Sequence, residues 1–140
     1  MIAEILSVGT ELLLGDIVDT NSQYLSQKLS QMGIDVFYRS CVGDNKPRML
    51  DTLRLALSRS DIVLITGGLG PTMDDITREC VAEVFDLPME QDDTAAQMIL
   101  ARYEKTGRAV PDNALKQAYV PKGSTVFQNS CGTAPGSATV

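Results

Sequence analysis

The hydrophobic positions in the first half of the chain follow two alternating patterns. Short apolar runs, each typical of a β-strand, occupy residues 2–8, 34–42 and 62–65. Between these runs, leucine and methionine recur every three or four residues over 21–32 and 47–57, which predicts one apolar face on each of two α-helices. Strands that alternate with helices predict a doubly wound α/β fold with a mostly parallel sheet.

The second half of the chain continues with further predicted elements. We expect a helix that begins near Thr72, a second helix over 93–106 and a short helical turn over 113–118. A strand over 124–127 precedes an extended segment that begins at residue 137. Residues 1–140 carry no internal repeat or linker, so we expect a single domain.

Composition excludes several kinds of chemistry. The 140 residues include no histidine, which excludes Ser-His-Asp triads, Cys-His nucleophiles and HExxH zinc sites. Catalysis would then use carboxylates, lysine, tyrosine, cysteine, a metal or backbone amides. With no tryptophan and 5% aromatic residues, a base-stacking surface is poorly supported.

Charge and targeting signals narrow the partners and the compartment. The net charge of −6 gives no electrostatic reason to bind nucleic acid or an anionic membrane, so we expect a small phosphorylated ligand, held where local geometry or a cation overcomes the field. No run approaches the roughly 20 apolar residues of a membrane span, and the first four residues lack the basic flank and apolar stretch typical of a signal peptide. The 3 scattered cysteines fit reduced thiols, and we expect a cytoplasmic protein.

A glycine-rich loop after the third predicted strand is a candidate phosphate cradle. Residues 66–72 read Thr-Gly-Gly-Leu-Gly-Pro-Thr and lead directly toward a predicted helix. Glycines let the backbone approach a ligand closely, and a helix N-terminus offers unpaired amides. The alternative is a tight strand-to-helix turn with no ligand, because the loop matches neither GxGxxG nor a Walker A motif.

Carboxylates near these predicted loops suggest a cation. Asp74 and Asp75 follow the glycine loop, where Mg²⁺-type ions are held by one or two carboxylates together with substrate phosphates. The alternative is that both residues only compensate the helix dipole. Glu11, Asp16 and Asp19 lie in the long connection after the first strand and are further candidates, unless that loop is pinned by its leucines and the acids face water.

Five blocks occur in a family-specific order. They are Gly-Thr-Glu-Leu-Leu-Leu-Gly at 9–15, Asp-Thr-Asn at 19–21, Val-Gly-Asp-Asn at 42–45, residues 66–77, and Gly-Thr-Ala-Pro-Gly at 132–136. Together they resemble the N-terminal domain of the CinA family of competence/damage-inducible proteins, within the MoaB/Mog-like molybdopterin-binding superfamily. The resemblance covers the whole chain. The family continues into another strand and a Leu-Pro-Gly-Pro-Pro loop, so the resemblance implies that residues 1–140 are a domain truncated at its C-terminal end. Members of the family often add a C-terminal deamidase domain.

The resemblance implies a three-layer αβα fold and a pocket built by three loops. Asp19 and Asp75 match aspartates that are functional in pterin-binding relatives, and we expect them to be catalytic. Relatives commonly carry arginine before the second aspartate; Asp74 stands there instead, which favours a metal on Asp74 and Asp75. The expected ligand-binding residues share these loops; they are Gly9, Thr10, Glu11, Gly67, Gly68, Gly70, Thr72, Gly132, Thr133 and Gly136.

The resemblance also implies an activity. CinA-like N-terminal domains are associated with hydrolysis of ADP-ribose to AMP and ribose 5-phosphate, using a divalent metal such as Mg²⁺, Mn²⁺ or Co²⁺. The first alternative is a binding module for molybdopterin or a nucleotide, without hydrolysis. The second is a mainly structural domain whose loops hold an assembly together. We expect a homo-oligomer in each case.

Overall fold

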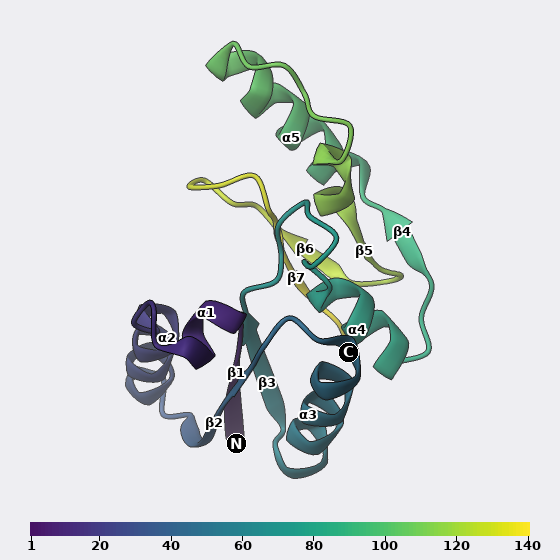
Figure 1. Ribbon diagram of the computed structural model, residues 1–140. Coiled ribbons are helices and arrows are strands. Elements are labelled where there is room, and N and C mark those ends of the chain that lie inside the picture. The colour runs from purple at the N-terminus through teal and green to yellow at the C-terminus, as the bar shows by residue number, and fades with distance from the viewer. The chain divides into compact units, whose positions relative to one another are not determined.

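The computed structural model describes residues 1–140 and contains two compact units, residues 1–68 and residues 69–140 (Figure 1). The first unit holds a parallel sheet between helices, and the second holds three helical segments and two small antiparallel strand pairs. The expectation of a single domain over 1–140 stays a prediction. No helix in the chain has the length and apolar character needed to cross a membrane.

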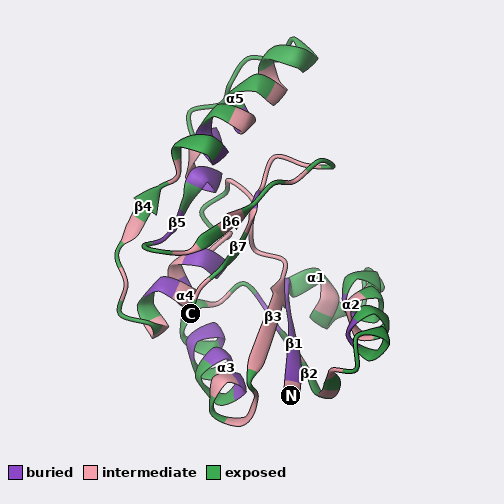
Figure 2. Ribbon diagram, turned by 180° about the vertical axis from the view of Figure 1, so that it is seen from behind, coloured by how far each residue is buried: buried purple, intermediate pink, exposed green.

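The sheet of the first unit confirms the predicted parallel α/β arrangement. It contains β1 (Ile2–Val8), β2 (Asp35–Val42) and β3 (Ile62–Thr66) in the order β2-β1-β3, with both pairings parallel. The central strand β1 is buried along its length, as Figure 2 shows. The apolar run of β3 predicts a strand covered on both faces, yet β3 lies at the sheet edge and its residues are only half-buried.

Two helices cover opposite faces of this sheet and confirm the three-layer αβα fold. Successive side chains of a strand point to opposite faces. Ala3 and Ile5 pack against Leu29 of α2 (Thr20–Gln31), whereas the intervening Glu4 reaches α3 (Lys46–Arg59). The buried face of α3 contains Met49, Leu50, Leu53 and Ala56.

The connection after β1 is not the continuous loop that its length suggests. It begins with a one-turn helix, α1 (Thr10–Leu14), which ends at Gly15 in the left-handed conformation. No residue of α1 is buried. The helix α2 starts at Thr20, one residue earlier than the pattern over 21–32 predicts, because Asp19 caps it by accepting a hydrogen bond from the Ser22 amide.

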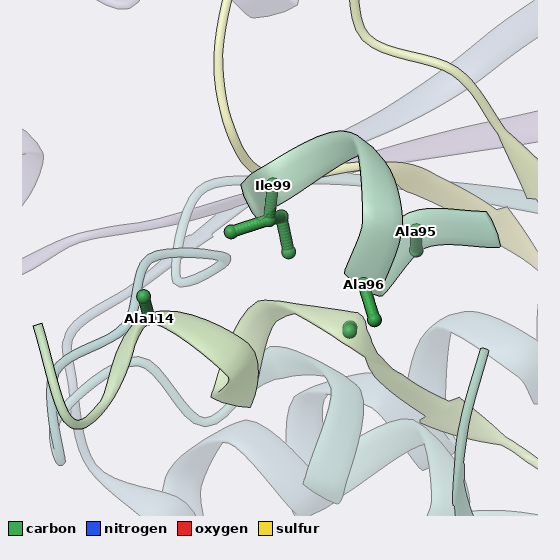
Figure 3. Packing of buried hydrophobic residues seen from close by; sticks show 5 residues of the cluster. Ala95, Ala96, Ile99 and Ala114 are labelled. Atoms are coloured by element: carbon green, nitrogen blue, oxygen red, sulfur yellow. The ribbon is translucent and has the colours of Figure 1, made fainter. Parts of the chain in front are cut away.

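The second unit is built from short elements. Its helical segments are α4 (Thr77–Val84), α5 (Asp93–Thr106) and the 3₁₀-helix η1 (Ala114–Ala118). The antiparallel pairs are β4 (Met89–Gln91) with β5 (Tyr119–Pro121), and β6 (Thr125–Phe127) with β7 (Gly136–Ala138). Figure 3 shows the small residues through which α5 and η1 approach closely; the buried cluster consists of Ala95, Ala96, Ile99, Ala114 and Ala118.

The expected helix near Thr72 was placed too early in the sequence. The α4 helix begins only at Thr77, and the preceding residues form a loop. The Thr72 hydroxyl and amide both donate to the Asp75 carboxylate, and both residues lie before the helix. This local closure competes with helix formation, as short polar side chains often do.

Candidate functional site

A cavity of about 130 Å³ lies in the first unit and gathers several of the predicted residues. It lies where β1 and β3 end, which is the edge of a parallel sheet at which ligands usually bind. Its lining consists of Val8, Glu11, Leu12, Ile17, Val18, Asp19, Thr20, Asn21, Thr66 and Gly67. Three predicted residues, Glu11, Asp19 and Gly67, therefore come together here.

Asp19 is held by both of its carboxylate oxygens. The Ser7 hydroxyl donates to Oδ2 at 2.5 Å, and the Ser22 amide donates to Oδ1 at 3.0 Å. Burial alone would raise the pKa of Asp19, but these hydrogen bonds outweigh it and hold the pKa below its ordinary value. Asp19 is therefore a fixed anion that ties the end of β1 to the start of α2.

Gly9, Thr10 and Glu11 at the start of α1 differ in whether they can contact a ligand in this cavity. The Thr10 hydroxyl donates to Asp44 Oδ2 at 3.0 Å and accepts from the Asp44 amide at 3.1 Å, which occupies it. A Cβ on Gly9 would lie 2.5 Å from Glu11 Oε1, so the Glu11 side chain folds back over this glycine. Of these three predicted residues, only Glu11 lines the cavity.

Gly67 is required by the backbone itself. Its φ is +94°, a conformation that favours glycine, and a Cβ at this position would overlap the Val8 carbonyl oxygen. Gly68 also has a positive φ, +62°. The need for glycine at 67 is thus explained by the close approach of β3 to the end of β1, whatever a ligand adds.

In the second unit, the rest of the glycine loop closes around Asp75. Asp75 Oδ2 accepts from the Thr72 amide at 2.9 Å and from the Thr72 hydroxyl at 2.6 Å, and the Gly70 backbone donates a further hydrogen bond. Burial would raise the pKa of Asp75, but these donors outweigh it and lower the pKa below its ordinary value. The loop donors thus converge on a carboxylate, while Asp74 is exposed beside them.

The Asn129 side chain bonds to the second glycine loop at three points. Asn129 Oδ1 accepts from the amides of Cys131 at 2.9 Å and Gly132 at 3.0 Å, and its amide nitrogen donates to the Ala134 carbonyl at 2.8 Å. Gly132 and Thr133 line a cavity of about 290 Å³ in this unit. Gly136, the third predicted residue of the loop, begins β7.

Two basic residues that sequence reasoning missed position these loops. The Arg78 side chain is 5% exposed, and its guanidinium donates to the carbonyls of Leu69 at 3.0 Å and Pro135 at 3.1 Å. Lys116 donates to the carbonyls of Thr72 and Asp75, both at 2.5 Å, and forms an ion pair with Glu79 at 3.4 Å. A charged residue on a helix ordinarily indicates a solvent-facing position, so no sequence signal marks either one.

The carboxylates can hold a divalent cation only if a phosphorylated ligand supplies further oxygen ligands. No group of three or more aspartate, glutamate or cysteine side chains lies close enough together to hold a metal ion. Asp75 supplies one fixed, ionised carboxylate, and Mg²⁺ is commonly held by one or two carboxylates, water and the substrate's phosphates. The donor set therefore suits an ion that arrives with a phosphorylated ligand.

Comparison with known proteins gives the family. The family model described as "Probable molybdopterin binding domain" matches residues 4–139. A "Putative competence-damage inducible protein" of Clostridium kluyveri is 51% identical over 139 residues, covering 99% of this chain and 34% of that protein. A "CinA-like protein" of Dictyoglomus thermophilum is 52% identical over 136 residues, covering 97% of this chain and 33% of that protein. This chain belongs to the CinA-like family of molybdopterin-binding domains.

Solved structures agree with this assignment. The CinA-like chain superimposes on CinA from Thermoplasma acidophilum, a protein described as of unknown function, with a TM-score of 0.86 and 35% identity over 97% of this chain and 79% of that one. It matches the molybdopterin biosynthesis enzyme MoaB from Thermus thermophilus with a TM-score of 0.58 and 25% identity, over 86% and 78% of the two chains. The CinA-like chain spans about a third of the length of the curated relatives named above.

Proposed function

We propose that the CinA-like chain binds a phosphorylated nucleotide and hydrolyses ADP-ribose to AMP and ribose 5-phosphate with the help of a divalent cation. The observation that carries this proposal is the fixed, ionised carboxylate of Asp75 at the glycine loop. A carboxylate held in this way repels a bare diphosphate and attracts the cation that a diphosphate brings with it.

The reaction divides the ligand at its diphosphate. The oxygen of a water molecule forms a bond to one phosphorus, the bridging oxygen leaves with the other phosphate, and a proton is released to solvent. A bound divalent cation would neutralise part of the negative charge on the phosphates. The lowered pKa of Asp75 makes this residue a poor base at neutral pH. The role of Asp75 is therefore to hold the cation beside the phosphates. We assign Asp74 as a second, exposed carboxylate for the same cation.

A turnover assay on matched variants tests this proposal. The purified chain is incubated with ADP-ribose and Mg²⁺, Mn²⁺ or Co²⁺, and the products are followed by phosphorus NMR with and without a chelator. We expect chelator-sensitive formation of AMP and ribose 5-phosphate, and a loss of about 100-fold in Asp75→Asn. Asp112→Asn removes an equal charge from an exposed position and is expected to retain turnover. Wild-type turnover in Asp75→Asn would refute the role of Asp75.

One observation favours a second function, a non-hydrolytic binding module for molybdopterin or a nucleotide. Three donors of the glycine loop, the Thr72 amide and hydroxyl and the Gly70 amide, are already bonded to Asp75, and no preformed set of three metal ligands is present. The matched relative from Thermus thermophilus is described as a molybdopterin biosynthesis enzyme, which supports a pterin as the alternative ligand. Ligand binding that persists in chelator, with no product formed under any of the metals, would favour this function.

A further inference from the structure

One face of α5 lines the cavity of about 290 Å³ in the second unit. Met98, Ala101, Arg102 and Lys105 follow the spacing that places residues on one side of a helix, and all four line the cavity. The opposite wall comes from the loop around Gly132 and Pro135. The face of α5 that carries Ala96 and Ile99 packs instead on η1, and Ala95 lies between this face and the cavity.

The two cations on this face lack acidic partners. The Arg102 guanidinium donates to the carbonyls of Cys131 at 2.9 Å and Ser130 at 3.5 Å but forms no ion pair, and the Lys105 side chain forms neither a hydrogen bond nor an ion pair. The chain as a whole has a net charge of −6, so carboxylates are plentiful elsewhere. Two adjacent, uncompensated positive charges on a cavity wall therefore favour an anionic occupant.

Apart from the Thr133 hydroxyl, the rest of the lining is apolar or already hydrogen-bonded. Ala95, Met98 and Pro135 give the cavity a non-polar wall. The amides of Cys131 and Gly132 are occupied by Asn129 Oδ1, so they are not free to bind an anion. Recognition of charge in this cavity consequently falls to the side chains of α5.

We propose that this cavity binds a nucleoside monophosphate group, with Arg102 and Lys105 holding the phosphate oxygens and the non-polar wall contacting the nucleoside. The choice of a nucleotide as the ligand rests on the proposed function. The link between the two is that Gly132 and Thr133 line this cavity and are also among the ligand-binding residues expected from the sequence. Guanidinium and ammonium groups are the side chains best suited to phosphate.

The test measures binding separately from hydrolysis. AMP, adenosine and inorganic phosphate are each titrated into the full chain by calorimetry in the presence of a chelator. We expect AMP to bind at least about tenfold more tightly than either adenosine or phosphate, because only AMP uses both parts of the cavity. Higher salt is expected to weaken AMP binding, since these charges are partly exposed.

Lys105→Gln is the sharpest variant because Lys105 makes no bond whose loss would disturb the fold. We expect it to weaken AMP binding about fivefold, the effect of one partly exposed charge, and to leave adenosine binding unchanged. Arg108→Gln is the matched control, because Arg108 is exposed and lies outside the cavity lining. We expect its AMP affinity to stay within about twofold of wild type.

The outcomes separate this inference from the proposed hydrolysis. Equal AMP affinity in Lys105→Gln and wild type, or no measurable AMP binding, overturns the cavity assignment even if ADP-ribose is hydrolysed. Lys105-dependent AMP binding without ADP-ribose hydrolysis upholds the cavity and rejects the hydrolase. Equal affinities for AMP and inorganic phosphate would overturn the part assigned to the non-polar wall.

Discussion

Glu4 is the most thoroughly buried charge in the first unit, with 0% of its surface exposed. Arg59 donates to both of its carboxylate oxygens, at 2.8 and 2.7 Å, and the Ser40 hydroxyl donates at 2.6 Å. The Arg59 guanidinium also lies 3.8 Å from the centre of the Tyr38 ring. These contacts join the sheet to one of its helical layers, since Glu4 lies on β1, Ser40 on β2 and Arg59 on α3.

Glu4→Gln should therefore destabilise the fold in a pH-dependent way. The hydrogen bonds from Arg59, opposed by burial, lower the pKa of Glu4 below its ordinary value of 4.5. The ionised carboxylate thus adds stability that is present above about pH 4.5 and is lost as the pH falls through the lower folded-state pKa. We expect a loss of about 2 kcal/mol at pH 7, measured by urea unfolding.

The same measurement at about pH 3 provides the internal control for Glu4. There the wild-type protein has lost part of the contribution from Glu4, so the difference between the two proteins should narrow. A difference that stays constant over this range would show that the effect comes from packing and not from charge.

Arg78 is a second residue whose substitution should lower the free energy of unfolding. Arg78→Met keeps an unbranched side chain but leaves the Pro135 carbonyl without its donor, while the Leu69 carbonyl keeps only the Gln117 amide at 3.4 Å. An orphaned buried acceptor costs about 1–3 kcal/mol, so urea unfolding should show a loss of about 2 kcal/mol. Arg54→Met, at an exposed position on α3, should change stability by less than about 0.5 kcal/mol. Equal effects would argue against a special role for Arg78.

At the scale of the elements, local signals decide how much the sequence predicts. Residues 93–106 match α5 because an aspartate precedes the helix and Gly107 ends it in the left-handed conformation, φ +65°. The strands β4 and β5 were missed because three residues are too few to show a period, and their pairing joins distant segments. The sequence places the start of α4 too early because a threonine followed three residues later by an aspartate can form either a helix cap or a closed loop. In the structure the Thr72 hydroxyl donates to Asp75 within a loop.

The candidate site divides in the same way. Asp19 and Gly67 were predicted because polar residues and glycines that closely follow predicted parallel strands lie near the edge of the sheet at which ligands usually bind. Asp75 was predicted from its place after the glycine loop. Arg78, Arg102 and Lys116 were not, because nothing in a single sequence separates a helical cation that faces a loop from one that faces water. Their roles depend on contacts with segments distant in the sequence, such as Pro135 and Cys131.

The junction of β1 and β3 offers a test at the element scale. Gly67→Ala places a methyl group against the Val8 carbonyl oxygen at a positive φ, so we expect a loss of at least about 3 kcal/mol in urea unfolding. Gly33→Ala shares the positive φ, +73°, but has open space around it. Its expected loss is only about 1–2 kcal/mol. Equal losses would mean that backbone conformation, and not the close approach, explains Gly67.

At the scale of the whole molecule, net charge predicts what the chain avoids. A charge of −6 repels polyanions over about 10 Å at moderate salt, and the cations of α5 are too few to offset this along a duplex. We expect fluorescence anisotropy to detect no binding of duplex DNA at micromolar protein and about 0.1 M salt. Saturable binding that weakens with salt would contradict this expectation.

The two carbonyl partners of Arg78 also have a consequence for biosynthesis. Leu69 lies just upstream of the arginine, but Pro135 leaves the ribosome 57 residues after it. A nascent chain can therefore fold β1 to β3 early, while the second unit must keep its guanidinium hydrated until its last loop has emerged. We expect the closing of that loop to be a late event in folding, so that nascent chains stalled before Pro135 remain sensitive to protease in this region while the first unit is already protected.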